Sequence, residues 1–316
     1  MTRVIFLAGL GRSGTTLLER ALGELAAVQP LGEVVHLWRR GIVQDELCGC
    51  GAPFSRCEFW TGVGRHAFDG WDNVDVARIA AARARADRLR RVPQLALGAR
   101  RGRTRRAGAL LAEHHRRLYA AAAELSGAEA VVDSSKHPSL AFCLREHGSI
   151  DLRVVHVVRD SRGVAHSWEK RVARPDARNG SQPEMTRYAA PRSALLWSLH
   201  NTSVRAIAKL GTPVMLVRYE SFLRSPAETV ADVARFAGLA VDRAHLGFVS
   251  DAEIRVGPAH TCGGNPLRFD PGPLTLRADD AWRSRLSRRD RVVVTALSYP
   301  QLRRYGYVDA LGRARA

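Results

Sequence analysis

A glycine-rich segment near the N-terminus constrains the fold of this chain more than any other feature. Residues 9 to 16 read Gly-Leu-Gly-Arg-Ser-Gly-Thr-Thr and follow the apolar run from Val4 to Leu7. The helix-forming stretch from Leu17 to Leu22 comes directly after them. A buried strand, a glycine-rich turn and a helix in this order form a loop whose backbone amides converge on an anion. The segment therefore predicts an α/β fold with an anion-binding loop at the end of its first strand.

The loop departs from the Walker pattern of nucleotide triphosphatases at one position. That pattern has a lysine after its last glycine, and the lysine reaches the β- and γ-phosphates. This chain has Thr15 at that position, and Arg12 supplies the fixed charge of the loop. The departure points away from a triphosphate as the ligand.

Length and composition limit the remaining alternatives. With 316 residues, 46% of them hydrophobic, the chain can bury a large core. We expect residues 1–316 to form a single domain, with an arginine-rich helical insertion at about 72–126. No apolar run approaches the roughly eighteen residues of a membrane span, and the N-terminal apolar run is too short for a signal peptide. These features predict a cytoplasmic protein without a membrane span.

The positive charge of the chain is unevenly distributed. The formal net charge is +18, and the segment from Arg78 to Arg117 holds thirteen arginines against two acids. The absence of interleaved aromatic residues favours a solvated helical face over a nucleic-acid surface. The alternative is that this arginine-rich segment guides an anionic acceptor to the site.

Three of the five cysteines lie close together in the sequence, at Cys48, Cys50 and Cys57. Without a secretory signal, a reducing compartment is expected. A zinc site would need a fourth ligand, for which His36 and His66 are nearest in sequence, and the Cys-x-Cys-x6-Cys spacing is not a standard zinc signature. The pattern favours a small structural knuckle or a local disulfide over zinc, and no metal is expected.

Further apolar runs predict additional strands of a parallel sheet. The predicted strands cover residues 130–133, 152–158 and 214–217. Residues 30–33 are predicted to turn the chain back, residues 41–70 to form a cysteine- and glycine-rich loop, and residues 171–190 to form a mobile loop. Strands that alternate with helices indicate a P-loop-type parallel sheet flanked by helices, with ligands at the carboxyl ends of the strands.

Two motifs at these strand ends resemble one known family, the sulfotransferases that use 3′-phosphoadenosine 5′-phosphosulfate. Gly11-Arg12-Ser13-Gly14-Thr15-Thr16 is similar to the family's 5′-phosphosulfate loop, in the arginine-containing form of carbohydrate and tyrosylprotein sulfotransferases. Arg159 with Ser167, eight residues later, resembles the pair that binds the 3′-phosphate. The segment around Tyr219 also resembles the family, in which this tyrosine lies beside the nucleotide. The resemblance runs from Val4 to about Tyr307.

The resemblance also implies catalytic roles. Leu31-Gly32-Glu33 resembles the segment that carries the catalytic glutamate of tyrosylprotein sulfotransferases, which makes Glu33 the expected base. A partly dry cleft would raise its pKa enough to take a proton. Other branches of the family use a histidine, and His36 is the alternative base. Lys136 resembles the lysine that neutralises the bridging oxygen of the leaving group, and Arg12 is the third expected catalytic residue.

The glycine-rich segment from His260 to Arg268 resembles the C-terminal phosphate-binding region of bacterial members of the family. It lacks the lysine-glycine pattern of the cytosolic animal enzymes. Asn265 and Arg268 are the cofactor-binding candidates of this segment. Asp279 and Trp282 are expected to pack the last helix.

These observations predict an enzyme that moves a sulfuryl group from 3′-phosphoadenosine 5′-phosphosulfate to a hydroxyl or amine, with adenosine 3′,5′-bisphosphate as the product. The acceptor is expected to be a small molecule, a glycan or a lipid, and the arginine-rich segment favours an anionic one. Nucleic acid is not an expected partner of this enzyme. The alternatives are a P-loop kinase and a non-catalytic binder of nucleic acid or another polyanion.

Overall fold

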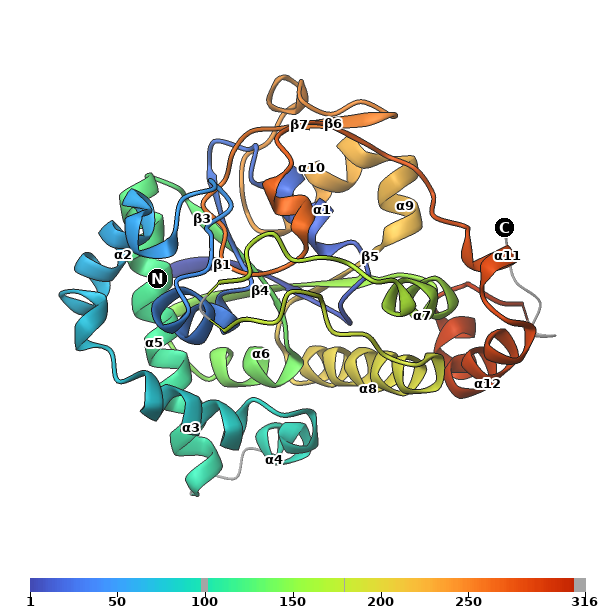
Figure 1. The fold of residues 1–316 in the computed structure, drawn as a ribbon, viewed down its shortest axis with the longest axis horizontal. Helices are drawn as coiled ribbons and strands as arrows, with labels where there is room; N and C mark the ends of the chain where they lie inside the picture. Colours follow the sequence, from blue (N-terminus) through green and yellow to red (C-terminus); the bar gives the residue numbers. More distant parts are fainter. Residues whose placement is uncertain (98–101, 179, 310–316) are drawn as a thin grey trace.

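A five-stranded parallel sheet forms the centre of the described chain (Figure 1). The structure, a computed structural model, describes residues 1–97, 102–178 and 180–309. The strand order is β2-β3-β1-β4-β5. The strands are β1 Thr2–Ala8, β2 Val28–Gly32, β3 Ala130–Lys136, β4 Ile150–Val158 and β5 Val214–Arg218. The central strands are rich in buried β-branched residues, as expected for a parallel sheet that is covered on both faces. The predicted fold class is confirmed.

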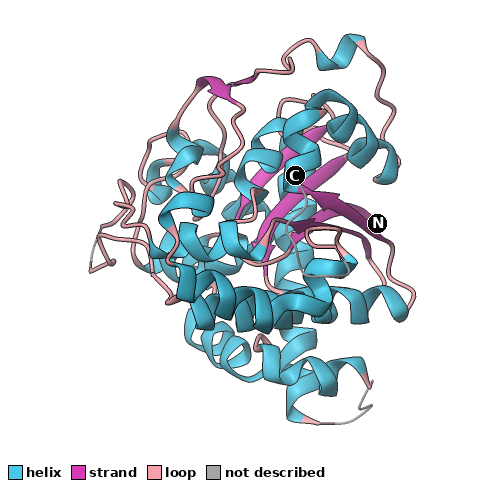
Figure 2. Ribbon diagram, turned by 90° about the vertical axis from the view of Figure 1, so that its right-hand side faces the viewer, coloured by secondary structure: helices cyan, strands magenta, loops and turns pink. Residues whose placement is uncertain are grey.

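Helices cover both faces of this sheet (Figures 1 and 2). Val4, Phe6 and Val154 point to one face, which packs against α5, α6 and α8. Ile5 and Val155 point to the other face, which packs against α1, α9 and α10. The bounds are α1 Thr15–Leu22, α5 Arg103–Ser126, α6 Pro138–Leu144, α8 Ala190–Lys209, α9 Tyr219–Arg224 and α10 Pro226–Phe236. Among the described residues, no helix is both long enough and apolar enough to cross a membrane.

The arginine-rich segment is helical, and its longest helix is part of the sheet packing. α5 buries Leu111, Leu118 and Tyr119, and it is the last helix of the connection between β2 and β3. The shorter helices before it are α2 Glu58–Phe68, α3 Val76–Ala86 and α4 Val92–Ala96. Arg100 and Arg101, two of the thirteen arginines, lie outside the described residues.

Two local predictions were wrong. Residues 28–32 form β2 where a turn was predicted at Pro30. β2 lies at the edge of the sheet, where a proline that cannot donate to the ladder is tolerated. The predicted loop over residues 41–70 contains α2, whose buried face includes Trp60 and Val63.

The rest of the described chain adds a small sheet and three more α-helices. β6 Glu253–Val256 and β7 Gly272–Thr275 pair antiparallel, and β6 packs against α1 within the hydrophobic cluster on that side of the main sheet. Residues 161–169 form α7 Ser161–Glu169, which lies beside α8 (Figure 1). The chain continues through α11 Trp282–Arg285 and α12 Arg288–Arg304.

Candidate active site

A cavity of about 690 Å³ lies where the carboxyl ends of the strands of the main sheet meet. Every strand of this sheet is followed by residues that line it, and the loop after β1 contributes most of them. The structure thus brings together most of the residues that were predicted from the sequence. Those that line the cavity are Gly11, Arg12, Gly14, Thr15, Thr16, Glu33, Lys136, Arg159, Ser167, Tyr219 and Asn265.

The glycine-rich loop presents a free helix N-terminus to this cavity. α1 starts at Thr15, with no side-chain cap and no acidic residue in its first turn. Its amides therefore remain available to an anion. Gly14 has φ 91°, and a Cβ atom there would lie 2.3 Å from the ring of Tyr219. The loop thus requires glycine at this position, because the tyrosine packs directly against its backbone.

Arg12 carries buried hydrogen-bond donors that have no partner among the described residues. Its Nε and Nη2 atoms are buried and unpaired. Burial lowers the pKa of the Arg12 guanidinium, and the charge of Glu33 opposes this effect. The guanidinium lies over the Trp168 ring, 5.3 Å from its centroid. Unpaired buried cationic donors beside a free helix N-terminus fit an anionic ligand group. Ser13 is buried beside Arg12, but its side chain does not line the cavity.

Trp168 is a cavity residue that the sequence analysis missed. It follows Ser167 on α7, and its indole N–H donates a hydrogen bond of 3.0 Å to the carbonyl of Gly11. Its ring also contacts Tyr188, with 4.5 Å between the centroids. No sequence pattern linked this tryptophan to the loop, because the contact spans more than 150 positions.

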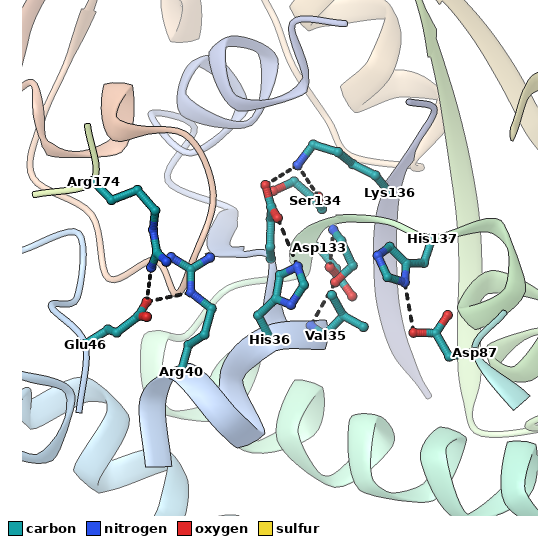
Figure 3. Close-up of polar contacts among 12 residues, drawn as sticks. Val35, His36, Arg40, Glu46, Asp87, Asp133, Ser134, Lys136, His137 and Arg174 are labelled. Carbon is teal, nitrogen blue, oxygen red and sulfur yellow. Dashed lines mark hydrogen bonds and ion pairs between the residues drawn. The ribbon is translucent and has the colours of Figure 1, made fainter. Parts of the chain in front are cut away.

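Glu33 and Lys136 form an ion pair inside the cavity. The Lys136 ammonium also donates to the carbonyl of Ser134 at 2.9 Å (Figure 3). His36 Nε2 lies 3.5 Å from the second Glu33 oxygen. Lys136 adopts φ 68°, a left-handed conformation that is costly for a residue with a side chain and is often found at functional sites.

The charge state of this group differs from the sequence prediction. Burial alone would raise the pKa of the Glu33 carboxyl, but the charge of Lys136 and the hydrogen bond with His36 outweigh burial and lower that pKa. Burial lowers the pKa of His36 to about 4, so this imidazole is neutral at pH 7. The expectation that the cleft raises the pKa of Glu33 therefore does not hold while Lys136 is its partner.

A second acidic residue, Asp87, holds the segment that follows Lys136. Asp87 Oδ2 lies 2.8 Å from His137 Nδ1 (Figure 3), and Ser139 donates to Asp87 Oδ1 at 2.7 Å. The carboxylate of Asp87 therefore holds the two residues that follow Lys136 closely in the chain. Asp87 comes from the end of α3, so its role could not be read from a local motif.

Arg159 follows β4 and faces the cavity, but it has a protein partner. Its Nη2 lies 3.3 Å from the carboxylate of Asp279, and its guanidinium stacks over Tyr219 at 4.9 Å. Lys170 shares the same carboxylate at 3.1 Å. Asp279 was expected to pack the last helix; instead, it joins the cations at the predicted 3′-phosphate position.

Arg268 does not reach the cavity. Its guanidinium is buried and donates to the carbonyl of Thr261 at 2.6 Å and to Asp176 Oδ2 at 2.8 Å. Asn265, three residues earlier, lines the cavity and caps a short helical turn by accepting from the Leu267 amide. The C-terminal segment therefore places Asn265 at the cavity and uses Arg268 to hold its own fold.

Asp176 belongs to a buried ion-pair network that anchors the predicted mobile loop. It pairs with Arg40 at 2.7 Å, and Arg40 also pairs with Glu46 at 2.5 Å. Arg174 reaches Glu46 at 2.7 Å from the other side (Figure 3). This network ties Arg174 and Asp176 of the loop to the segment after β2.

A sequence model of the sulfotransferase family matches residues 4–243 of the chain. The sulfotransferase domain of the curacin biosynthetic pathway aligns with a TM-score of 0.48 and 13% identity, over 94% of this chain and 97% of that domain. The sulfotransferase domain of the Synechococcus PCC 7002 olefin synthase aligns with a TM-score of 0.44 and 19% identity, over 95% and 94%. A sulfotransferase from Mycobacterium tuberculosis H37Rv aligns with a TM-score of 0.41 and 19% identity, over 78% and 70%. A search of the curated proteins found no match. Because the family model covers most of the chain, the chain belongs to the sulfotransferase family.

Proposed function

We propose that this sulfotransferase takes its sulfuryl group from 3′-phosphoadenosine 5′-phosphosulfate and transfers it to a hydroxyl or amine of an acceptor. The observation that carries the proposal is the set of unpaired donors on Arg12 beside the uncapped N-terminus of α1. These donors share one cavity with the ion pair of Glu33 and Lys136. The arrangement suits an anionic group next to a residue pair that can move a proton.

The donor loop would hold the 5′-phosphosulfate through backbone amides and Arg12. Gly11 to Thr16 supply the amides, and a sulfuryl donor has no β,γ-diphosphate that calls for the Walker lysine. Tyr219 lies against Gly14 and forms one wall of the site. Membership in the sulfotransferase family favours this use of the loop over phosphoryl transfer.

Transfer breaks the bond between sulfur and the oxygen that bridges to the 5′-phosphate, and it forms a bond between sulfur and the acceptor oxygen or nitrogen. The electron pair of the broken bond stays on the phosphate, where Lys136 neutralises the added charge. The acceptor proton goes to Glu33. When the Lys136 ammonium moves toward the leaving group, it stabilises the Glu33 carboxylate less. Burial then raises the proton affinity of Glu33.

Arg159 and Ser167 are proposed to bind the 3′-phosphate. Arg159 can bind a phosphate through two parallel hydrogen bonds. The Asp279 carboxylate occupies the same guanidinium, so the phosphate has to displace it. Lys170 is close enough to join Arg159 once this carboxylate is released.

Part of the cavity remains for the acceptor. Its other wall comes from the anchored loop and α8, and includes Gln182, Met185, Tyr188 and His200. This mixed polar and apolar wall suits a small molecule or a glycan that offers a hydroxyl. Asn265, which also lines the cavity, is proposed to contact the donor.

Calorimetric titration with adenosine 3′,5′-bisphosphate tests the donor site. We expect Arg159→Ala to weaken binding about 10- to 100-fold, as for loss of a charged hydrogen-bond pair. Asp279→Asn should tighten binding, because it removes the competing carboxylate. The matched control is Arg153→Ala, which removes an arginine from within β4 that pairs with Asp151 and does not line the cavity. Unchanged affinity in Arg159→Ala would remove the 3′-phosphate assignment.

A transfer assay tests the reaction itself. The protein is incubated with the donor and a library of small molecules, and mass spectrometry detects an added sulfonate group. We expect Arg12→Ala to abolish the transfer found with the unchanged protein. Mg²⁺-dependent binding of ATP in preference to the phosphosulfate nucleotide would contradict the proposal.

A further inference from the structure

Four side chains with metal-binding atoms converge outside the cavity. They are Cys48, Cys50, Cys57 and His260, and their ligand atoms all lie within 4.8 Å of one another. The Sγ atoms of Cys48 and Cys57 are 3.6 Å apart, and those of Cys50 and Cys57 are 3.8 Å apart. His260 Nδ1 lies 3.3 Å from the Cys57 sulfur and 3.9 Å from the Cys48 sulfur. None of these side chains lines the cavity described above.

These distances match the edges of a tetrahedron around one zinc ion. Zinc binds thiolate sulfur at about 2.3 Å and imidazole nitrogen at about 2.0–2.1 Å. In a tetrahedron, these bond lengths place two sulfurs about 3.8 Å apart and a sulfur and a nitrogen about 3.6 Å apart. The observed separations scatter around these values. Three sulfurs and one nitrogen form a closed set of four ligands, which is typical of structural zinc sites.

A disulfide explains the cluster less well. A disulfide joins two sulfurs at about 2.05 Å and would leave the third cysteine of the cluster unpaired. All five cysteines are free thiols in the structure. A disulfide also gives no reason for an imidazole nitrogen to point at two sulfurs. The histidine therefore distinguishes a metal site from a knuckle held by a disulfide.

The backbone around the cluster holds the ligands in place. The Cys48 amide donates to the Ala52 carbonyl at 2.8 Å, and Gly51 turns the chain with φ 87° between the second and third cysteines. Cys57 is the N-cap residue of α2, and its carbonyl accepts a hydrogen bond of 2.8 Å from the Thr61 amide. Backbone hydrogen bonds therefore fix the positions of Cys48 and Cys57.

Other contacts, outside the cysteine segment's own hydrogen bonds, hold the fourth ligand, His260. The His260 ring stacks on Phe59, with 5.2 Å between the centroids and 17° between the planes. The Gly49 amide donates to the carbonyl of Thr261 at 2.9 Å, so the two loops touch through their backbones. A Cβ atom at Gly49 would lie 2.5 Å from the Ala259 carbonyl oxygen, which shows how closely the loops approach.

We propose that Cys48, Cys50, Cys57 and His260 bind one structural Zn²⁺ ion. The ion would join two segments that are more than 200 positions apart in the chain. The second segment continues to Cys262, whose backbone pairs with Leu31 and Glu33, and to Gly264, which lies against the Glu33 side chain. The metal would therefore fix the loop that packs on Glu33.

The nearest histidines in the sequence have other partners. His36 contacts Glu33, and His66 pairs with Glu124 at 2.9 Å. The ligand that completes the set comes instead from the far end of the chain. Sequence spacing could not reveal it, because the fold alone brings His260 to the cysteines.

Elemental analysis of the purified full-length chain tests the site. We expect about one zinc per chain in protein from zinc-supplemented cells, and loss of that zinc in Cys57→Ser and His260→Ala. The matched control is Cys143→Ser, which changes a buried cysteine of α6, and this variant should keep its zinc. Zinc retained at the same stoichiometry in both cluster variants would overturn the proposal.

Two measurements on the unchanged protein keep the test independent of how the variants fold. After removal of zinc, added Co²⁺ should give the strong visible and near-ultraviolet bands of tetrahedral thiolate coordination. Thiol titration of the unfolded, chelated protein should count five free thiols. A count of three, with no zinc and no cobalt bands, would establish a disulfide and refute the metal site.

Discussion

The ammonium of Lys136 controls the protonation chemistry of the cavity. It balances the buried Glu33 carboxylate, which lowers the pKa of that carboxyl. A carboxylate with a low pKa is a poor base. Glu33 can accept a proton only when the Lys136 ammonium pairs with another anion instead. In this arrangement, proton transfer and charge neutralisation at the leaving group depend on each other.

Replacing Glu33 tests this dependence. We expect Glu33→Gln to lower kcat about 100-fold or more, as is usual when a general base is removed. Donor affinity should stay the same or rise, because the change removes a negative charge beside Lys136. Steady-state kinetics with an acceptor from the transfer assay, together with donor titration, measures both effects.

His36 provides the matched comparison. It lies in the same cavity, and its imidazole is neutral at pH 7. If Glu33 is the base, His36→Gln should change kcat much less than Glu33→Gln does. Full activity in Glu33→Gln combined with a large loss in His36→Gln would transfer the role of the base to the histidine.

At the scale of elements, the sequence patterns that predicted the fold well were those governed by burial. β4 is a β-branched run that is covered on both faces, so its pattern alone identified it. β2 contains Pro30 and lies at an edge, where local propensity gives little signal. α2 was missed because glycines and a cysteine knuckle surround it, and its helical pattern is short.

The site was predictable where one motif follows one strand. The loop after β1, Lys136 at the end of β3 and Arg159 after β4 all line the cavity, because parallel strands bring their carboxyl ends to one edge. Trp168, Asp279 and His260 were not recognised, because each acts through a contact between distant segments. Such contacts depend on loop packing, which no local pattern encodes.

The anchored loop gives a prediction at the same scale. Asp176 is buried and pairs with Arg40, Arg174 and Arg268. We expect Asp176→Ala to lower the free energy of unfolding by about 3–5 kcal/mol, because it leaves buried cations uncompensated. Limited proteolysis should also cut the chain faster within residues 170–189.

An exposed ion pair serves as the control for this substitution. Asp232 pairs with Arg235 on the surface of α10, and Asp232→Ala should change the free energy of unfolding by less than about 1 kcal/mol. Urea denaturation measures both variants. Equal small effects would mean that the buried network does not hold the loop.

At the scale of the whole molecule, buried titratable groups make stability depend on pH. Among the described residues, burial lowers the pKa of four histidines to about 4; they are His36, His115, His156 and His200. Burial raises the pKa of Glu19 to about 7 and that of Asp133 to about 6, and it also raises the pKa of Glu169. On acidification, the buried histidines lower the free energy of unfolding and these carboxyls raise it, and the histidines outnumber the carboxyls.

The balance predicts that the protein loses stability on mild acidification. Near pH 5.5 the unfolded chain gains protons on the four histidines, whereas the folded chain gains fewer, mainly on Glu19 and Asp133. The free energy of unfolding should therefore fall by about 2–3 kcal/mol for each unit of pH lost between 6.5 and 5. Urea denaturation at several pH values measures this slope. His156→Gln should reduce the slope by up to about 1.4 kcal/mol per pH unit, since it removes one such group. Stability that stayed constant or rose on acidification would show that the buried histidines do not set the response to pH.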